Sequence, residues 1–98
     1  MMQVVIQPSK SKAKKMDAII DGKKTVHFGQ KNASDFTLHK DPERKERYIN
    51  RHKKNERWDD PTTAGYYSRW ILWNKPTLKQ SVDDLNKRYK NIDFILRK

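Results

Sequence analysis

The sequence predicts a single α+β domain over residues 1–98, with strands towards both ends of the chain and helices between them. Three observations lead to this fold class. The first third is β-prone and contains an Asp-Gly turn, the middle contains two Asp-Pro helix starts, and the last residues alternate apolar and polar side chains. Strands, then helices, then a returning strand are typical of α+β folds, and 98 residues suit one domain. We therefore expect an N-terminal β-hairpin region, three helices and a C-terminal strand that completes a small antiparallel sheet.

The first third is expected to supply the first strands. Residues 4–6 form a short β-prone run, and residues 8–15 follow with four lysines, which predicts a flexible basic loop. The Asp21-Gly22 pair tolerates positive φ, so it predicts a two-residue turn that joins strands at 18–20 and 25–28.

The middle of the chain is expected to be mainly helical. Residues 36–38 are β-prone and predict one further strand before the helices begin. The Asp-Pro-Glu sequence at 41–43 then predicts a helix start, because Asp caps free N–H groups and Pro suits the first helical position. This helix should run to about residue 55. A second Asp-Pro pair, at 60–61, predicts a helix over 63–73.

The last third predicts one more helix and the closing strand. Thr77 and Gln80 have the spacing of a capping box. The apolar residues that follow recur on one helical face, at Leu78, Val82, Leu85 and Tyr89. Ile92, Phe94 and Leu96 then alternate with other residues, which predicts a strand.

The composition restricts the classes of function. The chain carries 23 Lys+Arg against 12 Asp+Glu, a formal net charge of +11, which predicts an anionic partner such as nucleic acid or an acidic protein surface. It has no cysteine, which excludes disulfides, thiol catalysis and cysteine-bound zinc. Its longest apolar run is residues 70–73, whereas a membrane span needs about 20 apolar residues. We expect a soluble intracellular protein without a signal peptide.

The sequence contains no recognisable catalytic signature. It lacks a phosphate-cradling glycine loop and a nucleophile elbow, and its adjacent carboxylates at 59–60 and 83–84 are explained by helix positions. His27, His39 and His52 lack the spacing of a metal site. We expect no catalytic residue, metal, cofactor or small-molecule substrate.

A stripe of cations is predicted on one face of the first long helix. Its residues are spaced by three, four and three positions: Arg44, Arg47, Arg51 and Lys54. Three interpretations stay open. The stripe contacts phosphates, it contacts an acidic protein, or it is a solvated face paired with Asp41, Glu43 and Glu46.

Two further groups are candidates for partner contacts. The first is the basic loop, with Lys10, Lys12, Lys14 and Lys15. The second is a concentration of aromatic residues around the second predicted helix, interleaved with Arg57 and Arg69. Such aromatics stack on bases, anchor a protein interface or supply the core. We expect Trp70 and Trp73 in the core and keep Trp58 and Tyr67 as candidate contacts.

Three stretches of the chain carry a resemblance. They are Thr25-Val-His-Phe-Gly29, Asp35-Phe-Thr-Leu-His-Lys-Asp41 and the long run from Arg47 to Pro76, which includes Arg47-Tyr-Ile-Asn-Arg-His-Lys-Lys-Asn and Gly65-Tyr-Tyr-Ser-Arg-Trp-Ile-Leu-Trp-Asn-Lys-Pro76. Together they resemble a family of small basic proteins encoded by large nucleocytoplasmic DNA viruses, including chlorella viruses and mimivirus relatives. The similarity covers roughly residues 16–90. It brings no catalytic residues with it.

The resemblance implies a viral protein, made in an infected host cell and present in the virion. In that setting we expect a non-enzymatic minor capsid protein that bridges larger capsid proteins with acidic surfaces. The alternative is a viral nucleic-acid-binding or genome-packaging protein that contacts viral DNA. Interleaved acidic residues and the lack of a long basic tail weaken the case for pure DNA condensation.

Overall fold

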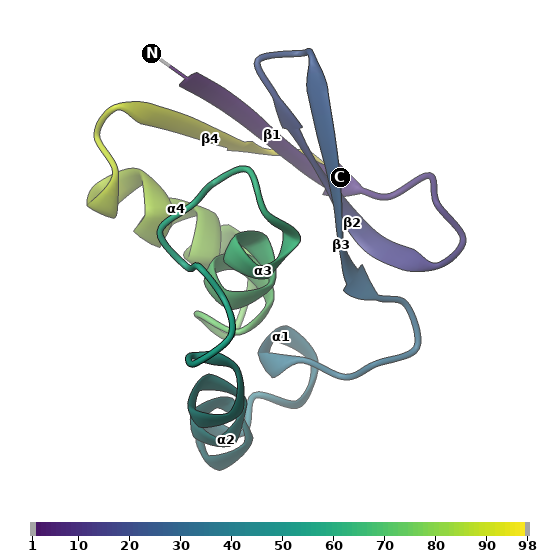
Figure 1. The fold of residues 1–98 in the computed structure, drawn as a ribbon, viewed down its shortest axis with the longest axis vertical. Helices are drawn as coiled ribbons and strands as arrows, with labels where there is room; N and C mark the ends of the chain where they lie inside the picture. Colours follow the sequence, from purple (N-terminus) through teal and green to yellow (C-terminus); the bar gives the residue numbers. More distant parts are fainter. Residues whose placement is uncertain (1, 98) are drawn as a thin grey trace.

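The computed structural model describes residues 2–97 and shows a four-stranded sheet with helices packed on one of its faces (Figure 1). The α+β class is confirmed. The elements follow in the order β1 (Met2–Pro8), β2 (Lys14–Ile20), β3 (Lys24–Gln30), α1 (Phe36–His39), α2 (Pro42–His52), α3 (Ala64–Tyr67), η1 (Ser68–Leu72), α4 (Leu78–Arg88) and β4 (Ile92–Leu96).

The sheet is mixed, so the predicted antiparallel sheet is wrong. The strand order is β3-β2-β1-β4, in which β1 pairs antiparallel with β2 but parallel with β4. After β1 the chain forms β2 and β3 and then all the helices. From α4 it returns to the sheet, where β4 pairs with the free edge of β1. A connection of that length can lay β4 parallel to β1, whereas a tight hairpin cannot.

Both hairpins differ from their predicted boundaries. Pro8 ends β1, and Lys14 and Lys15 already belong to β2, so the basic loop is confined to residues 9–13 rather than 8–15. At the second hairpin Asp21 and Gly22 both have positive φ, as predicted, but three residues rather than two separate the paired Ile20 and Lys24.

Residues 36–38 form no strand, because α1 begins there instead. The Asp35 carboxylate caps the helix by accepting from the Thr37 backbone N–H at 2.9 Å, and Lys40 ends it in the left-handed region with φ 55°. Asp35 is itself buried and held by the Lys15 ammonium at 2.5 Å. The Asp35 cap, held by Lys15 of β2, therefore favours a helix over the strand that the β-prone side chains predict. With α1, the described residues contain a fourth helix where three were expected.

The longer helices begin where the sequence predicts. Asp41 caps α2 by accepting from the Glu43 N–H, and Thr77 caps α4 by accepting from the Gln80 N–H at 3.1 Å. However, α2 ends at His52, short of the predicted residue 55. The helix expected over 63–73 is present as α3 and η1, and its second half is a π-helical turn closed by the bond from the Trp73 N–H to the Ser68 carbonyl.

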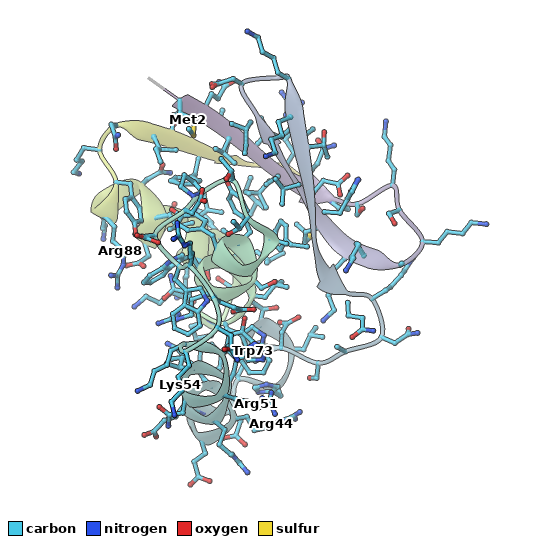
Figure 2. All side chains as sticks on the ribbon, in the orientation of Figure 1. Met2, Arg44, Arg51, Lys54, Trp73 and Arg88 are labelled. Atoms are coloured by element: carbon cyan, nitrogen blue, oxygen red, sulfur yellow. The ribbon has the colours of Figure 1, made fainter. Side chains whose placement is uncertain are left out.

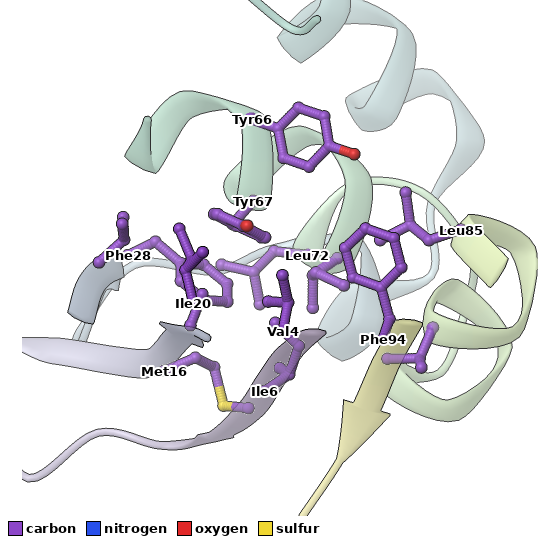
Figure 3. Close-up of a cluster of buried hydrophobic side chains, with 14 of the residues drawn as sticks. Val4, Ile6, Met16, Ile20, Phe28, Tyr66, Tyr67, Leu72, Leu85 and Phe94 are labelled. Carbon is purple, nitrogen blue, oxygen red and sulfur yellow. The ribbon is translucent and has the colours of Figure 1, made fainter. Parts of the chain in front are cut away.

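The core lies between the sheet and the pair formed by α3–η1 and α4 (Figure 3). Its fully buried side chains include Val4 and Ile6 from β1, Phe28 from β3 and Leu85 from α4. α2 lies off the sheet, below α3 in Figure 1, and therefore needs a second cluster of its own. No helix within residues 2–97 has the length and apolarity to cross a bilayer.

Candidate anion-binding site

Three arginines of α2 gather around one surface hollow. Arg44, Arg47 and Arg51 lie on the exposed side of the helix and, together with Trp73, line a hollow of roughly 230 Å³. Figure 2 shows Arg44 and Arg51 on the same side of α2, next to Trp73. The regular spacing of these arginines on an Asp-capped helix brings their side chains together. We call these three arginines and Trp73 the arginine face.

The arginine face has no carboxylate partner in the described chain. The four ion pairs among residues 2–97 lie elsewhere, and Arg47 donates only to the Glu43 backbone carbonyl at 3.4 Å. The interpretation of the stripe as a face paired with its own carboxylates is therefore not supported. Guanidinium groups left without intramolecular partners are suited to bidentate binding of carboxylate or phosphate.

Trp73 is held in place by a stack of aromatic rings. Its indole lies parallel to the buried Tyr48 ring, with centroids 4.3 Å apart and an interplanar angle of 2°. The Trp58 ring is also stacked with respect to Tyr48, with centroids 6.4 Å apart and an interplanar angle of 17°. Burial raises the pKa of Tyr48 well above its usual value, so the ring stays neutral at physiological pH. The stack therefore attaches α2 to the domain and fixes one wall of the hollow.

Positive charge accumulates behind the arginine face. Arg69 lies between two indoles, with its guanidinium carbon 4.4 Å from the Trp70 centroid and 5.5 Å from that of Trp58. Burial, followed by repulsion from Arg69 and Lys75, lowers the pKa of Lys45. Burial and the charge of Arg44 likewise lower the pKa of His39, which lies against Trp73. The structure concentrates cations here more densely than the nearby carboxylates neutralise them.

A second hollow of roughly 330 Å³ adjoins the first and shares Arg51 and Trp73 with it. It contains the Lys15–Asp35 ion pair. Apart from Arg51, its charged side chains are paired, because His52 also faces Glu56, so this hollow supplies less unneutralised charge than the arginine face.

The predicted contact residues are not all brought together. Lys54 lies beyond the end of α2, and Figure 2 shows it on the opposite side of that helix from Arg51. Lys10 and Lys12 are in the β1–β2 loop, which Figure 1 shows far from α2. Lys14 lies in β2, half-exposed. These lysines do not extend the arginine face.

Several predicted contacts have structural roles instead. Tyr67 is fully buried and packs on Phe28 with ring centroids 5.5 Å apart, so its prediction as a contact residue is wrong. Lys15 is engaged by Asp35. Trp58 is half-buried and donates to the Glu56 carboxylate. Arg57 is exposed, outside both hollows.

Trp73 is the site residue that the sequence was expected to place in the core rather than among the contact residues. It is half-buried, and its place beside the arginines depends on how η1 packs against α2. No spacing within either segment reveals that packing. Among residues 2–97, no three His, Cys, Asp or Glu side chains are grouped closely enough to hold a metal ion.

Comparison with known proteins identifies a family. Neither the curated proteins nor the solved structures contain a match to the chain. Residues 4–52 match the "Family of unknown function (DUF5754)", over the segment from β1 to the end of α2 that includes Arg44, Arg47 and Arg51. This match covers half of the chain, and the protein therefore belongs to that family.

Proposed function

We propose that this protein is a non-enzymatic structural protein of a virion, a minor capsid component that binds an acidic surface of a larger capsid protein through the arginine face of α2. The observation that carries the proposal is the convergence of Arg44, Arg47 and Arg51 on one hollow without a carboxylate partner in the described chain. The viral setting rests on the resemblance over residues 16–90.

The extent of the arginine face favours a compact anionic patch. Arg44 and Arg51 are two helical turns apart, about 10 Å along the axis. A protein that makes about 6–10 phosphate contacts with duplex DNA gains a large, salt-dependent share of its affinity from the backbone, and such contacts extend along the duplex. The loop lysines lie too far from α2 to lengthen the face into such a track. A cluster of carboxylates on a protein surface matches three arginines better.

A cryo-EM map of the source virion tests this proposal. We expect the protein at fixed, symmetry-related positions beneath the capsid shell, with α2 facing carboxylates of a neighbouring protein. Detection only with the packaged genome, or absence from purified virions, would contradict the capsid function.

Nucleic-acid binding is the second candidate, and the position of Trp73 favours it. An aromatic side chain among arginines is typical of sites that bind single strands by stacking and phosphate contacts. Fluorescence anisotropy with labelled single-stranded and duplex oligonucleotides at about 50 mM salt tests it. The R44Q/R47Q/R51Q variant should then bind more weakly and with a smaller salt slope, whereas the charge-matched K23Q/K24Q/K90Q variant should not. Lack of binding to both oligonucleotides excludes this candidate.

A further inference from the structure

An apolar groove borders α1, which contributes Thr37 and Leu38 to its lining. It measures roughly 560 Å³, and its apolar lining comes from five separate parts of the chain: Pro8, Met16, Leu38, Pro76 with Leu78, and Leu96. Leu78 and Leu96 are half-buried and pack on the main core. The floor of the groove is therefore an edge of the core that no other element covers. We call this hollow the apolar groove.

Leu38 lies in this groove and is the only large hydrophobic side chain of the described chain that is mostly exposed, at 64%. The one-turn helix α1 explains its orientation, because the helix buries Phe36 and turns Leu38 outwards. Single exposed leucines are common on protein surfaces. A leucine that lines an apolar groove of this size is instead typical of a binding site.

Among the described residues, three cations and no carboxylate line the groove. These cations are Lys40, Lys79 and Arg97, and all three are exposed; Thr37 and Thr77 complete the lining. None of them takes part in the four ion pairs among residues 2–97. The charge complementary to this rim is negative, so the occupant that fits best combines an apolar side chain with carboxylates.

Two other occupants fit less well. A second copy of the chain would bring two basic rims together, each on a protein with a formal charge of +11. An added strand would pair with the outer edge of β4, but there the Asn86 amide already donates to the Phe94 carbonyl and accepts from the Phe94 N–H. Recognition through side chains is therefore favoured over strand addition.

We propose that the apolar groove binds a peptide segment of another protein in which large apolar residues are flanked by Asp or Glu. The apolar side chains pack on Leu38, Leu78 and Leu96, and the flanking carboxylates face Lys79 and Arg97. The groove shares no residue with the arginine face. The protein thus has two separate binding surfaces, the arrangement that a bridging protein needs.

Binding of synthetic peptides to the full-length protein tests this proposal. The probe is a short fluorescein-labelled peptide with alternating Phe and Leu among Glu and Asp. One control peptide replaces its apolar residues with Ser, and the other replaces its acids with Gln and Asn. We expect saturable anisotropy for the probe alone, with amide NMR shifts at Leu38, Leu78 and Lys79.

Two variants separate the apolar and electrostatic contributions. Leu38→Ser should weaken binding at least about tenfold, because the apolar side chain that the peptide would bury is replaced by a polar one. This substitution replaces an exposed side chain, so the fold should persist. The K79E/R97E variant should weaken binding by a similar factor, whereas K23E/K24E should weaken it far less.

Several outcomes would overturn the proposal. One is no binding up to about 1 mM peptide. Another is equal binding of the control peptide in which Gln and Asn replace the acids, because the basic rim would then contribute nothing to binding. A third is binding lost in R44Q/R47Q/R51Q but kept in Leu38→Ser, because it places the peptide on the arginine face. Leu38-dependent self-association in sedimentation velocity, or Leu38-dependent binding to anionic lipid vesicles, would assign the groove to a second copy or to a lipid surface. The R44Q/R47Q/R51Q variant separates failure of this proposal from failure of the proposed function.

Discussion

Arg69 shows how a predicted contact residue becomes part of the protein's own structure. Its guanidinium is flanked by the Trp58 and Trp70 rings, and its Nη1 donates to the Trp73 carbonyl at 3.0 Å. Its Nε is buried without a hydrogen-bond partner, and burial lowers the pKa of the side chain. Interleaved aromatic and basic residues in a sequence therefore do not by themselves indicate a ligand site.

Replacement of Arg69 by alanine should destabilise the protein substantially. Arg69→Ala removes two cation–π contacts and a hydrogen bond to a carbonyl group, so we expect a loss of about 2–3 kcal/mol in the free energy of unfolding. Arg88→Ala is the matched control. Arg88 also faces Trp70, but it is exposed and should cost less than about 1 kcal/mol. Urea unfolding measures both, and equal losses would contradict the structural role of Arg69.

His39 should make stability depend on pH. Its Nδ1 accepts from the Asp41 N–H, its Nε2 is buried without a partner, and burial and Arg44 hold its pKa below 6.5. Protonation therefore favours the unfolded chain. This contribution is present above about pH 6.5 and is lost as the pH falls through the lower pKa of the folded state.

An NMR titration of the histidine ring protons measures that pKa directly, and urea unfolding from pH 7 to pH 5 measures its effect. His39→Gln should make the decline in unfolding free energy over this range shallower. A His39 pKa at or above the ordinary value would disprove the prediction.

The regular spacing of the arginine stripe was readable from the sequence, but its surroundings were not. Periodicity within one helix places Arg44, Arg47 and Arg51 on a common side. The same periodicity wrongly extended the stripe to Lys54, because α2 ends at His52. Trp73 directly follows η1, a different element, so its proximity to the arginines depends on tertiary packing.

At the scale of elements, the helix starts that depend on local hydrogen bonds were predictable, whereas the helix start that depends on a distant contact was not. The caps at Asp41 and Thr77 act on residues two or three positions ahead, so the sequence contains the whole interaction. The cap of α1 also depends on Lys15, which reaches Asp35 from β2. The sequence near residue 36 shows Asp35 and the β-prone side chains, but not the contact with Lys15 that holds Asp35.

The edge of β4 gives a prediction at this scale. Asn86→Asp keeps the acceptor for the Phe94 N–H but replaces the donor to the Phe94 carbonyl with a carboxylate oxygen. We expect a loss of about 1–3 kcal/mol in unfolding free energy and faster amide hydrogen exchange along β4. Asn50→Asp, an exposed change on α2, is the control and should change stability by less than about 0.5 kcal/mol. Similar effects at the two positions would show that Asn86 does not protect the edge.

At the scale of the whole molecule, the sequence predicts the class but not the sheet. The alternation over residues 92–96 predicts the strand. Whether that strand pairs with β1, and in which direction, depends on how α4 packs across the sheet. The net charge of +11 is likewise readable, whereas the hollow that three arginines form with Trp73 is a result of folding.

The central claim is that the arginine face, rather than the general positive charge, binds the anionic partner. NMR titration of the labelled protein with a polyglutamate peptide tests it most directly, because this peptide has no apolar residue for the groove. We predict saturable shifts of the Nε–H signals of Arg44, Arg47 and Arg51 and of the Trp73 indole, with Arg57 and Arg97 nearly unchanged. Small shifts spread evenly over all exposed arginines and lysines would contradict the claim.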